Sequence, residues 1–268
     1  MVAVELLGVS KKYRRHTERP LATTLKSYFL RDLWHRKDAT KNVIWALRDV
    51  NLKVERGATL GVIGRNGSGK STLLKVISRI LKPDAGTISV NGKVAALIEL
   101  GAGFHPELTG RENVMINGII LGLTKREIRA KLDEIVEFAE LREYIDDPVR
   151  TYSSGMYMRL GFSVAVHVDP DVLLIDEVLA VGDAAFSQKS IDRMGHFKAS
   201  GKTIILVSHD PELVQSWSDE AVWLDAGLLK MKGNPATVVK AYTHEVRSHS
   251  ESGDRASSAI GGESKLGH

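Results

Sequence analysis

In this chain the stretch that decides the fold is Gly64-Arg65-Asn66-Gly67-Ser68-Gly69-Lys70-Ser71-Thr72, termed the phosphate loop below. It fits the pattern G-x-x-x-x-G-K-S/T without a mismatch. An apolar run at positions 59–63 precedes it and predicts a buried strand, and apolar residues at helical spacing follow it as far as Ile77. Strand, glycine-rich loop and helix in this order predict a phosphate-binding site.

The chemistry of such a site accounts for the residue types in the loop. Glycines let successive backbone N–H groups form a concave nest for a polyphosphate, and the following helix directs its positive end at the same place. Lys70 adds a charge for the outer phosphates, and Ser71 offers a hydroxyl to magnesium. We therefore expect all residues of the phosphate loop to contact a nucleotide. The motif alone is shared by kinases, GTPases and motor ATPases.

A second marker is the segment Val172-Leu173-Leu174-Ile175-Asp176-Glu177. Its apolar residues predict a core strand that carries two carboxylates to one end of a sheet, where ligands bind in open α/β folds. We expect Asp176 to join the magnesium shell and Glu177 to polarise the water that attacks the γ-phosphate. Taken alone, such a segment is more often only a strand end, but the phosphate loop upstream favours the functional interpretation.

Composition is that of an ordinary globular protein. The chain has 268 residues, of which 43% are hydrophobic and 26% charged, and no cysteine. These values exclude a disulfide framework and favour one large domain or a domain with an inserted lobe. The first residues lack the order of a signal peptide, and the longest apolar stretches, such as 115–123, are too short to span a bilayer. A formal net charge of +4 is too small to indicate nucleic acid as a partner.

Alternating strand and helix signals predict an α/β fold with a mostly parallel sheet. We expect a nucleotide-binding domain over residues 1–246, with an antiparallel β subdomain and a helical subdomain inserted at about 105–168. A tail from 247 to 268 has almost no apolar residues and is predicted to be disordered.

A basic insertion at about 14–42 interrupts this plan. Between Lys11 and Lys41, basic residues greatly outnumber acidic ones, and Pro20 is placed to open an amphipathic helix over 20–34. Two interpretations stay open: a solvated basic face, or contact with an anionic membrane leaflet or a membrane-embedded partner.

Local signals mark several further elements. The dipeptide Asn91-Gly92 predicts a hairpin between two short strands within 86–100. Thr124 and Glu127 have the spacing of a capping box before an amphipathic helix. Residues 222–224 and 228–231 predict a final hairpin, and a helix is expected to begin at Asn234-Pro235.

The segment Tyr152-Ser153-Ser154-Gly155-Met156 carries the most specific resemblance. It lies between the phosphate loop and the Asp-Glu strand, and Val207-Ser208-His209-Asp210 follows later. This order resembles the ATP-binding-cassette (ABC) ATPases, whose signature is Leu-Ser-Gly-Gly-Gln; the chain keeps its serine and its second glycine. The Tyr-Ser-Ser-Gly-Met form is similar to that of exporters of O-antigen, teichoic acid and related polysaccharides. The resemblance covers about residues 2–246.

The resemblance implies roles for further residues. Tyr13 matches the aromatic that stacks on adenine, with Trp45 as the alternative. Asp183 matches an aspartate that touches the opposite subunit. Nucleotide contacts from a second copy are implied for Ser153, Ser154 and Gly155. The catalytic set implied in this way is Lys70, Glu177 and His209, the last as a sensor of the γ-phosphate.

One departure from the family concerns the segment that links core and helical subdomain. The family has a glutamine there, near magnesium, whereas this chain has glutamine only at positions 188 and 215. Glu99 is the best match and is assigned to the magnesium site on that basis. A carboxylate repels phosphate, so we do not expect Glu99 simply to replace glutamine. The loop at 100–106 is expected to contact the membrane partner.

The resemblance implies an ATPase that uses ATP and Mg²⁺ and works as a homodimer with integral-membrane permease subunits. It would lie peripherally on the cytoplasmic face of the inner membrane and power export of a lipid-linked polysaccharide, without a nucleic-acid partner. Two alternatives stay open: a transporter ATPase for another substrate, and a soluble ABC ATPase. Soluble members usually carry paired cassettes or long coiled coils, which are not found in this sequence. A P-loop kinase would not need the Ser-x-Gly helix start.

Overall fold

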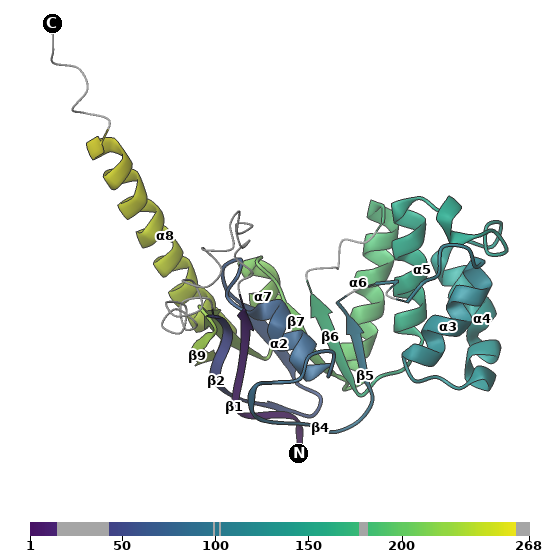
Figure 1. Cartoon of the computed structure of the whole chain (residues 1–268), viewed down its shortest axis with the longest axis horizontal. Coiled ribbons are helices and arrows are strands. Elements are labelled where there is room, and N and C mark those ends of the chain that lie inside the picture. Colours follow the sequence, from purple (N-terminus) through teal and green to yellow (C-terminus); the bar gives the residue numbers. More distant parts are fainter. Residues whose placement is uncertain (15–42, 99, 102, 177–181, 261–268) are drawn as a thin grey trace, which may run out of the picture.

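Two β-sheets and the helices packed on them make up the structure, a computed structural model that describes residues 1–14, 43–98, 100–101, 103–176 and 182–260 (Figure 1). The strands are β1 (Val2–Arg14), β2 (Val43–Glu55), β3 (Thr59–Ile63), β4 (Ala85–Val90), β5 (Val94–Leu97), β6 (Val172–Asp176), β7 (Thr203–Val207), β8 (Glu220–Asp225) and β9 (Leu228–Gly233). The helices are α2 (Lys70–Ile77), α3 (Gly110–Ile120), α4 (Lys125–Ala139), the 3₁₀ helix η2 (Val149–Thr151), α5 (Ser154–Val166), α6 (Ala184–Ala199), α7 (Pro211–Trp217) and α8 (Pro235–Ile260).

The larger sheet has the strand order β5-β6-β7-β3-β8-β9. All its neighbours pair in parallel except β9, which is antiparallel to β8. Strands β3 and β7 are buried along their whole length, and β6 along all but its last residue. Strands this apolar need cover on both faces, as in parallel sheets with helical crossovers. The predicted α/β fold is confirmed, and the carboxyl ends of β6, β7 and β3 meet at one edge.

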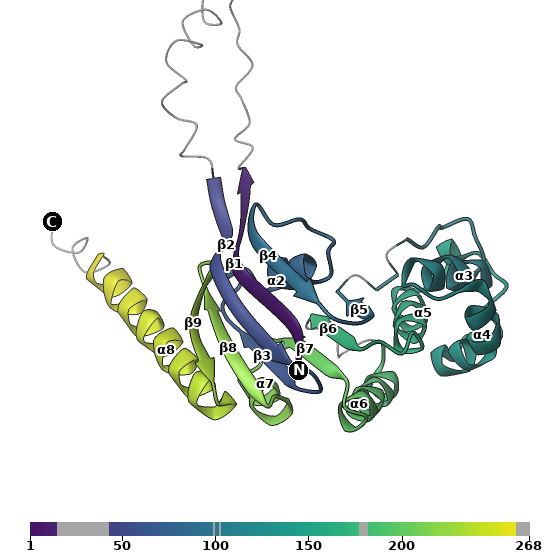
Figure 2. The same ribbon diagram turned by 90° about the horizontal axis from the view of Figure 1, so that it is seen from below.

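The smaller sheet is antiparallel, in the order β2-β1-β4 (Figure 2). Helix α2 packs between the two sheets. Its buried residues Leu73, Leu74 and Ile77 share one apolar core with Leu6 of β1 and Val62 of β3. The helix that follows the phosphate loop is therefore anchored on both sides.

One local prediction is wrong. The Asn91-Gly92 turn does not close a hairpin, because β4 pairs with β1 of the smaller sheet while β5 pairs in parallel with β6 of the larger one. The Asn91 N–H donates to the Ala3 carbonyl oxygen at 2.9 Å, which fixes the end of β4 beside β1. Beyond the turn, β5 buries Ala95 and Leu97 next to β6. Burial of β5 in the larger sheet outweighs the local preference of the turn for a hairpin.

Helices α3, α4, α5 and η2 form a lobe at one end of the molecule (Figure 1). They pack around an apolar core of their own. Two capping boxes start the first two of these helices: Thr124 with Glu127, as predicted, and Thr109 with Glu112, which has the same spacing. This helical lobe is therefore a locally stabilised unit, and α5 joins it to the larger sheet by packing Phe162 and Val166 against the core that includes Leu173 of β6.

The C-terminal region contains the predicted hairpin of β8 and β9, followed by α8. Asn234 Oδ1 accepts the Ala236 N–H at 3.0 Å, as expected of a helix cap. The helix continues to Ile260, so the prediction of disorder from residue 247 is wrong for 247–260. Adding residues to a helix that packing has already started is far less costly than nucleating one. Residues 261–268 lie outside the described residues.

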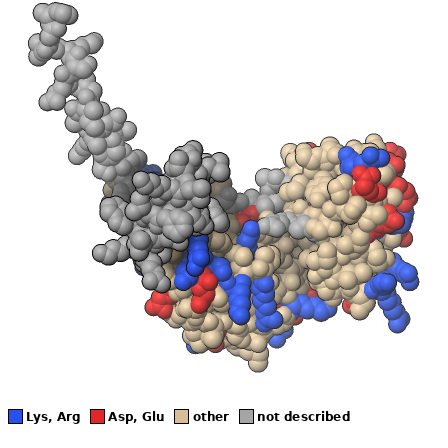
Figure 3. Space-filling view, in the orientation of Figure 1, with Lys and Arg blue, Asp and Glu red and all other residues tan. Residues whose placement is uncertain are grey.

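Several predictions fall on residues that the structure does not describe. These are the amphipathic helix at 20–34 with nearly all of the basic insertion, Glu99 and Glu177. On the face seen in Figure 3, Lys and Arg side chains gather along the lower middle of the molecule with some acidic side chains beside them, and both signs of charge also mix on the helical lobe. No helix in the described part of the chain combines the length and the apolar character needed to cross a bilayer.

Candidate functional site

Strand β3 delivers the phosphate loop to the carboxyl edge of the larger sheet, and neighbouring elements fix the path of the loop. Gly69 has φ of 109°, and a Cβ there would overlap the carbonyl oxygen of Ala46 on β2. On the other side, Gly227 in the β8–β9 turn donates its N–H to the Ser68 carbonyl oxygen at 2.9 Å. Contacts within its own chain thus shape the loop.

Lys70 is the first residue of α2 and is only 6% exposed. Its Nζ donates to the carbonyl oxygens of Gly64 at 2.8 Å and Arg65 at 3.2 Å, which holds the ammonium group across the loop. The first turn of α2 contains no acidic residue. The ammonium group and the first N–H groups of the helix therefore make one electropositive spot that suits a polyphosphate.

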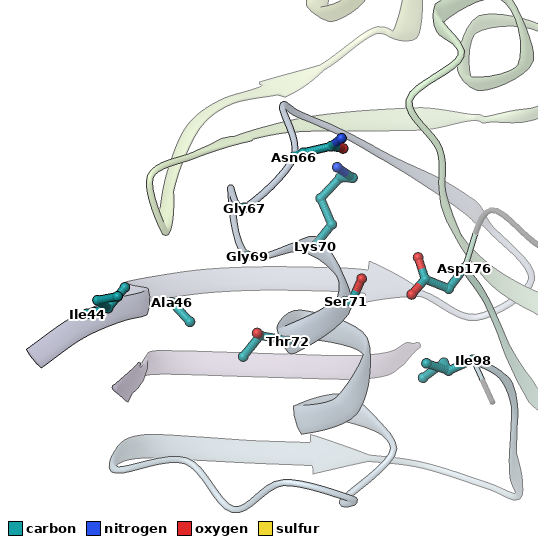
Figure 4. A pocket seen from close by; sticks show the side chains of 10 residues that line it. All are labelled: Ile44, Ala46, Asn66, Gly67, Gly69, Lys70, Ser71, Thr72, Ile98 and Asp176. Atoms are coloured by element: carbon teal, nitrogen blue, oxygen red, sulfur yellow. The ribbon is translucent and has the colours of Figure 1, made fainter. Parts of the chain in front are cut away.

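A cleft of about 500 Å³ opens beside this spot (Figure 4). Its lining comes from β2, the phosphate loop, α2 and the ends of β5 and β6: Ile44, Ala46, Asn66, Gly67, Gly69, Lys70, Ser71, Thr72, Ile98 and Asp176. Its three apolar members, Ile44, Ala46 and Ile98, were not predicted from the sequence. For the first two, the alternating pattern of residues 43–54 was the available signal.

Ser71 and Asp176 fit a hard divalent cation. Figure 4 shows the Ser71 hydroxyl and the Asp176 carboxylate pointing toward each other across the cleft. Magnesium takes few protein ligands and completes its shell with water and phosphate oxygens. Among the described residues, no group of three or more His, Cys, Asp or Glu side chains could hold a metal. The donor set therefore suits an ion that binds together with a polyphosphate; the third predicted ligand, Glu99, is outside the described residues.

The register of β1 and β2 separates the two aromatic candidates for stacking on a base. Tyr13 pairs with Ile44, and Lys12 pairs with Trp45. Cross-strand partners share a face, and neighbours along a strand alternate. Tyr13 therefore shares the face of the cleft residue Ile44, while Trp45 lies on the opposite face with Lys12 Nζ 5.7 Å from its ring centre. Neither aromatic lines the cleft itself, but the register favours Tyr13.

A second cavity, of about 510 Å³, adjoins the start of the phosphate loop. Its lining residues are Gly64, Arg65, Asn66, His209, Tyr242 and Val246. His209 stands between β7 and α7, whose cap residue Asp210 accepts the Glu212 N–H at 2.9 Å. Asn66 lines both cavities, so the structure places His209 next to the phosphate loop but not in the first cleft.

The predicted signature residues form a separate group. Ser153, Ser154, Gly155 and Asp183 line a cavity of about 450 Å³ that shares no residue with the two cavities above. Ser153 is the N-cap of α5, and its Oγ accepts the Met156 N–H at 3.2 Å. The structure brings the start of α5 together with Asp183, and brings neither to the phosphate loop of the same chain.

Arg159 links the two sides of this third cavity, which are α5 and Asp183. Asp183 caps α6 by accepting the Phe186 N–H at 2.9 Å, and Arg159 Nη1 lies 3.8 Å from Asp183 Oδ2 and 3.5 Å from Glu140 Oε2. Because Arg159 projects from α5, it links the helical lobe to the segment after β6. Sequence analysis missed this residue, and one arginine within a helix gives no signal for such a role.

Gly155 lies in open space as far as the described residues show. Among them, a Cβ at this position would meet only Ser153 Oγ, at 3.8 Å. Glycine in a helix costs about 1 kcal/mol of stability relative to alanine. The described surroundings of Gly155 therefore leave room for a side chain.

The linker between core and helical lobe, which includes Ile98, Leu100, Gly101 and Phe104, is bonded to α5. The Tyr157 hydroxyl donates to the Gly101 carbonyl oxygen at 2.9 Å, and the ring lies edge-on to Phe104 with centroids 5.0 Å apart. Beside the linker runs a largely apolar groove of about 420 Å³, whose lining includes Ile98 and Leu100. Ile98 also lines the first cleft, so the linker touches the cleft, the groove and the signature helix.

Tyr152 occupies the position where the family has leucine. Its hydroxyl donates to the Tyr144 carbonyl oxygen at 2.6 Å within the helical lobe. Burial, with a contribution from the charges of Asp147 and Asp146, raises the pKa of Tyr152 to about 12. The hydroxyl is thus a neutral structural donor at physiological pH. Tyr152 supports the helical lobe next to the start of α5, where Ser153, Ser154 and Gly155 form what is called the signature start below.

Known proteins resemble this chain in sequence and in fold. The sequence pattern of the family described as ABC transporter matches residues 47–180. The O-antigen export system ATP-binding protein RfbB of Myxococcus xanthus is 53% identical over 247 residues, which cover 92% of this chain and 56% of that protein. The protein of the same name from Klebsiella pneumoniae is 47% identical over 197 residues, 74% of this chain and 80% of that protein.

A third relative is the teichoic acids export ATP-binding protein TagH of Lactococcus lactis, 46% identical over 74% of this chain and 42% of that protein. The chain thus spans about half the length of the Myxococcus and Lactococcus relatives. Among solved structures, a dimeric ATP-binding cassette in a post-hydrolysis state, bound to ADP and phosphate, has a TM-score of 0.66. It is 22% identical and covers 87% of this chain and 98% of its own, a likeness that concerns the fold alone.

Proposed function

Because the chain belongs to the ABC transporter family, we propose that it binds and hydrolyses ATP at a seam between two copies and so powers export of a polysaccharide. One observation carries this proposal. The phosphate loop and the signature start, which the family resemblance assigns to one nucleotide, line separate cavities in a single chain. A site that contains both groups requires a second copy.

In this proposal each copy contributes opposite ends of the site. The phosphate loop, with Lys70 and the N-terminus of α2, binds the phosphates. Ser71 and Asp176 would hold Mg²⁺, which would neutralise phosphate charge. Glu177 orients the attacking water and accepts its proton. His209 contacts the γ-phosphate from the side of the second cavity. Tyr13, on the face of Ile44, stacks on the adenine.

The second copy supplies the start of α5. Ser153, Ser154 and the exposed helix N-terminus present N–H groups and a hydroxyl to the γ-phosphate, and Asp183 meets the opposite subunit nearby. The open space at Gly155 supports this arrangement, because a ligand held by another chain needs that space. ATP then closes the dimer, and charge separation on hydrolysis opens it.

The names of the relatives support the substrate class. Proteins 46–53% identical to this chain are named for export of O-antigens and teichoic acids, which are both polysaccharides. We propose a lipid-linked polysaccharide of this type as the cargo. It would move through a membrane permease, with this chain on the cytoplasmic face of the inner membrane.

The groove beside the linker is the proposed permease contact. Its apolar rim includes Ile80 and Ile120, which are 55% and 62% exposed. Exposed apolar side chains around a hollow mark a site for a protein partner. The linker joins this groove to the nucleotide cleft through Ile98, which gives a route from partner contact to hydrolysis.

The catalytic proposal is tested with Glu177→Gln and, as a matched control, the surface change Glu134→Gln on α4. We expect Glu177→Gln to bind ATP normally, to hydrolyse it at least about 100-fold more slowly, and to accumulate as an ATP-bound dimer. Phosphate release and light scattering give the two readouts. Wild-type turnover in Glu177→Gln contradicts the assigned role.

The substrate is tested separately in the host cell. Deleting the gene is expected to abolish the surface polysaccharide and to leave the lipid-linked glycan on the inner side of the membrane. An ATPase for another substrate leaves surface glycans unchanged, and a soluble ABC ATPase copurifies without any membrane protein.

A further inference from the structure

Helix α8 packs against both segments that carry predicted phosphate contacts. Its buried residues Val238 and Val239 share an apolar cluster with Ile63, the residue directly before the phosphate loop, and with Val214 of α7. Helix α7 begins two residues after His209. One helix therefore supports the base of the phosphate loop and the base of the segment that carries His209.

Tyr242 brings α8 to the site itself. It is 9% exposed, and its ring lies edge-on to Trp223 with centroids 6.0 Å apart. Trp223 in turn pairs with Ile63 in the sheet. On its other side, Tyr242 lines the second cavity together with Arg65 of the phosphate loop and with His209. The ring thus stands between the sheet that carries the loop and the cavity beside it.

The pKa of Tyr242 is consistent with a buried position beside Arg65. Burial raises the pKa of Tyr242, whereas the positive charge of Arg65 acts to lower it. The phenol is therefore close enough to the Arg65 guanidinium for its positive charge to act on the pKa of Tyr242. A change in the position of Arg65 therefore changes the surroundings of Tyr242.

We propose that Tyr242 is a positioning residue for Arg65 and His209, and that through it α8 responds to the nucleotide state. This rests on the ATP site proposed above. Past Tyr242 the helix continues to Ile260 and projects from the body of the molecule (Figure 1). At 1.5 Å per residue, that stretch is about 27 Å long, so a small tilt of α8 at Tyr242 becomes a larger displacement at the far end of the helix.

The experiment uses the full chain, which has no native cysteine. A single cysteine at the exposed position Ser248, introduced as Ser248→Cys, carries an environment-sensitive fluorophore on α8. The probe is a non-hydrolysable ATP analogue with Mg²⁺. The variants are Tyr242→Phe, which keeps the ring, and Tyr242→Leu, which keeps apolar volume. His244→Ala, on the same helix and exposed, is the matched control.

We expect the label to respond to the analogue in the wild type, in the control and in Tyr242→Phe. In Tyr242→Leu the response should fall at least about fivefold, while the Kd for the analogue stays within about threefold. For ATP turnover we expect kcat about tenfold lower and KM within about threefold, because Lys70 is untouched. If Tyr242 has only a structural role, Tyr242→Leu lowers the melting temperature. The folded variant, saturated with the analogue, then still gives the full response of the label.

Two results overturn the inference: a label that ignores bound nucleotide in the wild type, or a full response in Tyr242→Leu. A wild type that binds no nucleotide instead overturns the proposed function. Circular dichroism identifies the folded variants, and Tyr242→Phe with and without Arg65→Ala gives a second test if Tyr242→Leu does not fold. Because Arg65 belongs to the phosphate loop, both variants are measured at analogue concentrations that saturate them. Under saturation the response is expected in the single variant and lost in the double variant; a response in both contradicts the coupling.

Discussion

The phosphate loop of the core and the signature start of the helical lobe each place a glycine at the N-terminus of a helix, for different physical reasons. Gly69 has φ of 109°, and a Cβ there would overlap the Ala46 carbonyl oxygen, so its own chain requires glycine. At Gly155 a Cβ would meet, among the described residues, only Ser153 Oγ at 3.8 Å, so these residues leave room for a side chain. The phosphate loop, the core half of the site, takes its shape from contacts within its own chain. We propose that the signature start, the lobe half, is open to receive a nucleotide held by a second copy.

The largest expected effect comes from the core half. Lys70→Ala removes the ammonium group held across the loop by the Gly64 and Arg65 carbonyls. We expect hydrolysis to fall at least about 100-fold, because a preorganised charge at the phosphates is lost. Lys75→Ala, in the same helix but outside the cleft, is the control. Phosphate release measures both, and equal rates for the two variants would remove Lys70 from the site.

A smaller effect, with opposite signs for activity and stability, is expected from the lobe half. Gly155→Ala should raise the free energy of unfolding by up to about 1 kcal/mol, because alanine favours helix. Hydrolysis should fall about tenfold, because the added methyl occupies space needed by nucleotide from the second copy.

Gly69→Ala sharpens the same comparison, since its methyl has no room and must lower stability as well as activity. Urea unfolding and phosphate release are measured on both variants. If Gly155→Ala destabilises the chain as Gly69→Ala does, the distinction between the two halves fails.

A modest effect is expected where the lobe meets the linker. Tyr157→Phe removes the hydroxyl that donates to the Gly101 carbonyl oxygen at 2.9 Å. Loss of one such hydrogen bond should lower the free energy of unfolding by about 1 kcal/mol. Tyr144→Phe, at a 48% exposed side chain, is the control with an effect near zero. Urea titration compares them, and equal midpoints would mean that the hydroxyl does not fasten the linker.

The smallest effect concerns pH. Burial lowers the pKa of His167 below its usual 6.5, and its Nδ1 lies 2.6 Å from the Ser163 carbonyl oxygen. Below pH 6.5 the unfolded chain binds a proton here more readily than the folded chain does. Stability should therefore decrease as pH falls through this range, and His167→Gln should flatten that dependence. Unfolding curves between pH 5 and pH 7 check it; an unchanged slope in the variant contradicts the assignment.

Sequence reasoning found the features that depend on local patterns. The phosphate loop, the strand before Asp176, the Thr124 capping box and the start of α8 at Asn234 all follow from residues within one or two turns of chain. These signals are short-range, so a single sequence contains them.

What it missed depends on contacts between distant segments. The Asn91-Gly92 turn looks the same whether β5 pairs with β4 or with β6, and burial beside β6 decides. Ile44 reaches the cleft only through the register of β2 with β1. The helix beyond residue 247 depends on packing that begins a turn or more earlier. The second cavity, with Tyr242 beside Arg65, joins segments far apart in sequence.

The central claim is that one nucleotide needs the phosphate loop of one copy and the signature start of another. Mixing two inactive variants, Lys70→Ala and Gly155→Val, tests it most directly. In a mixed dimer one site combines both defects, and the other combines an intact loop with an intact signature start. Phosphate release from the equimolar mixture should rise to as much as about a quarter of the wild-type rate. A mixture as inactive as its separate components would contradict the shared site.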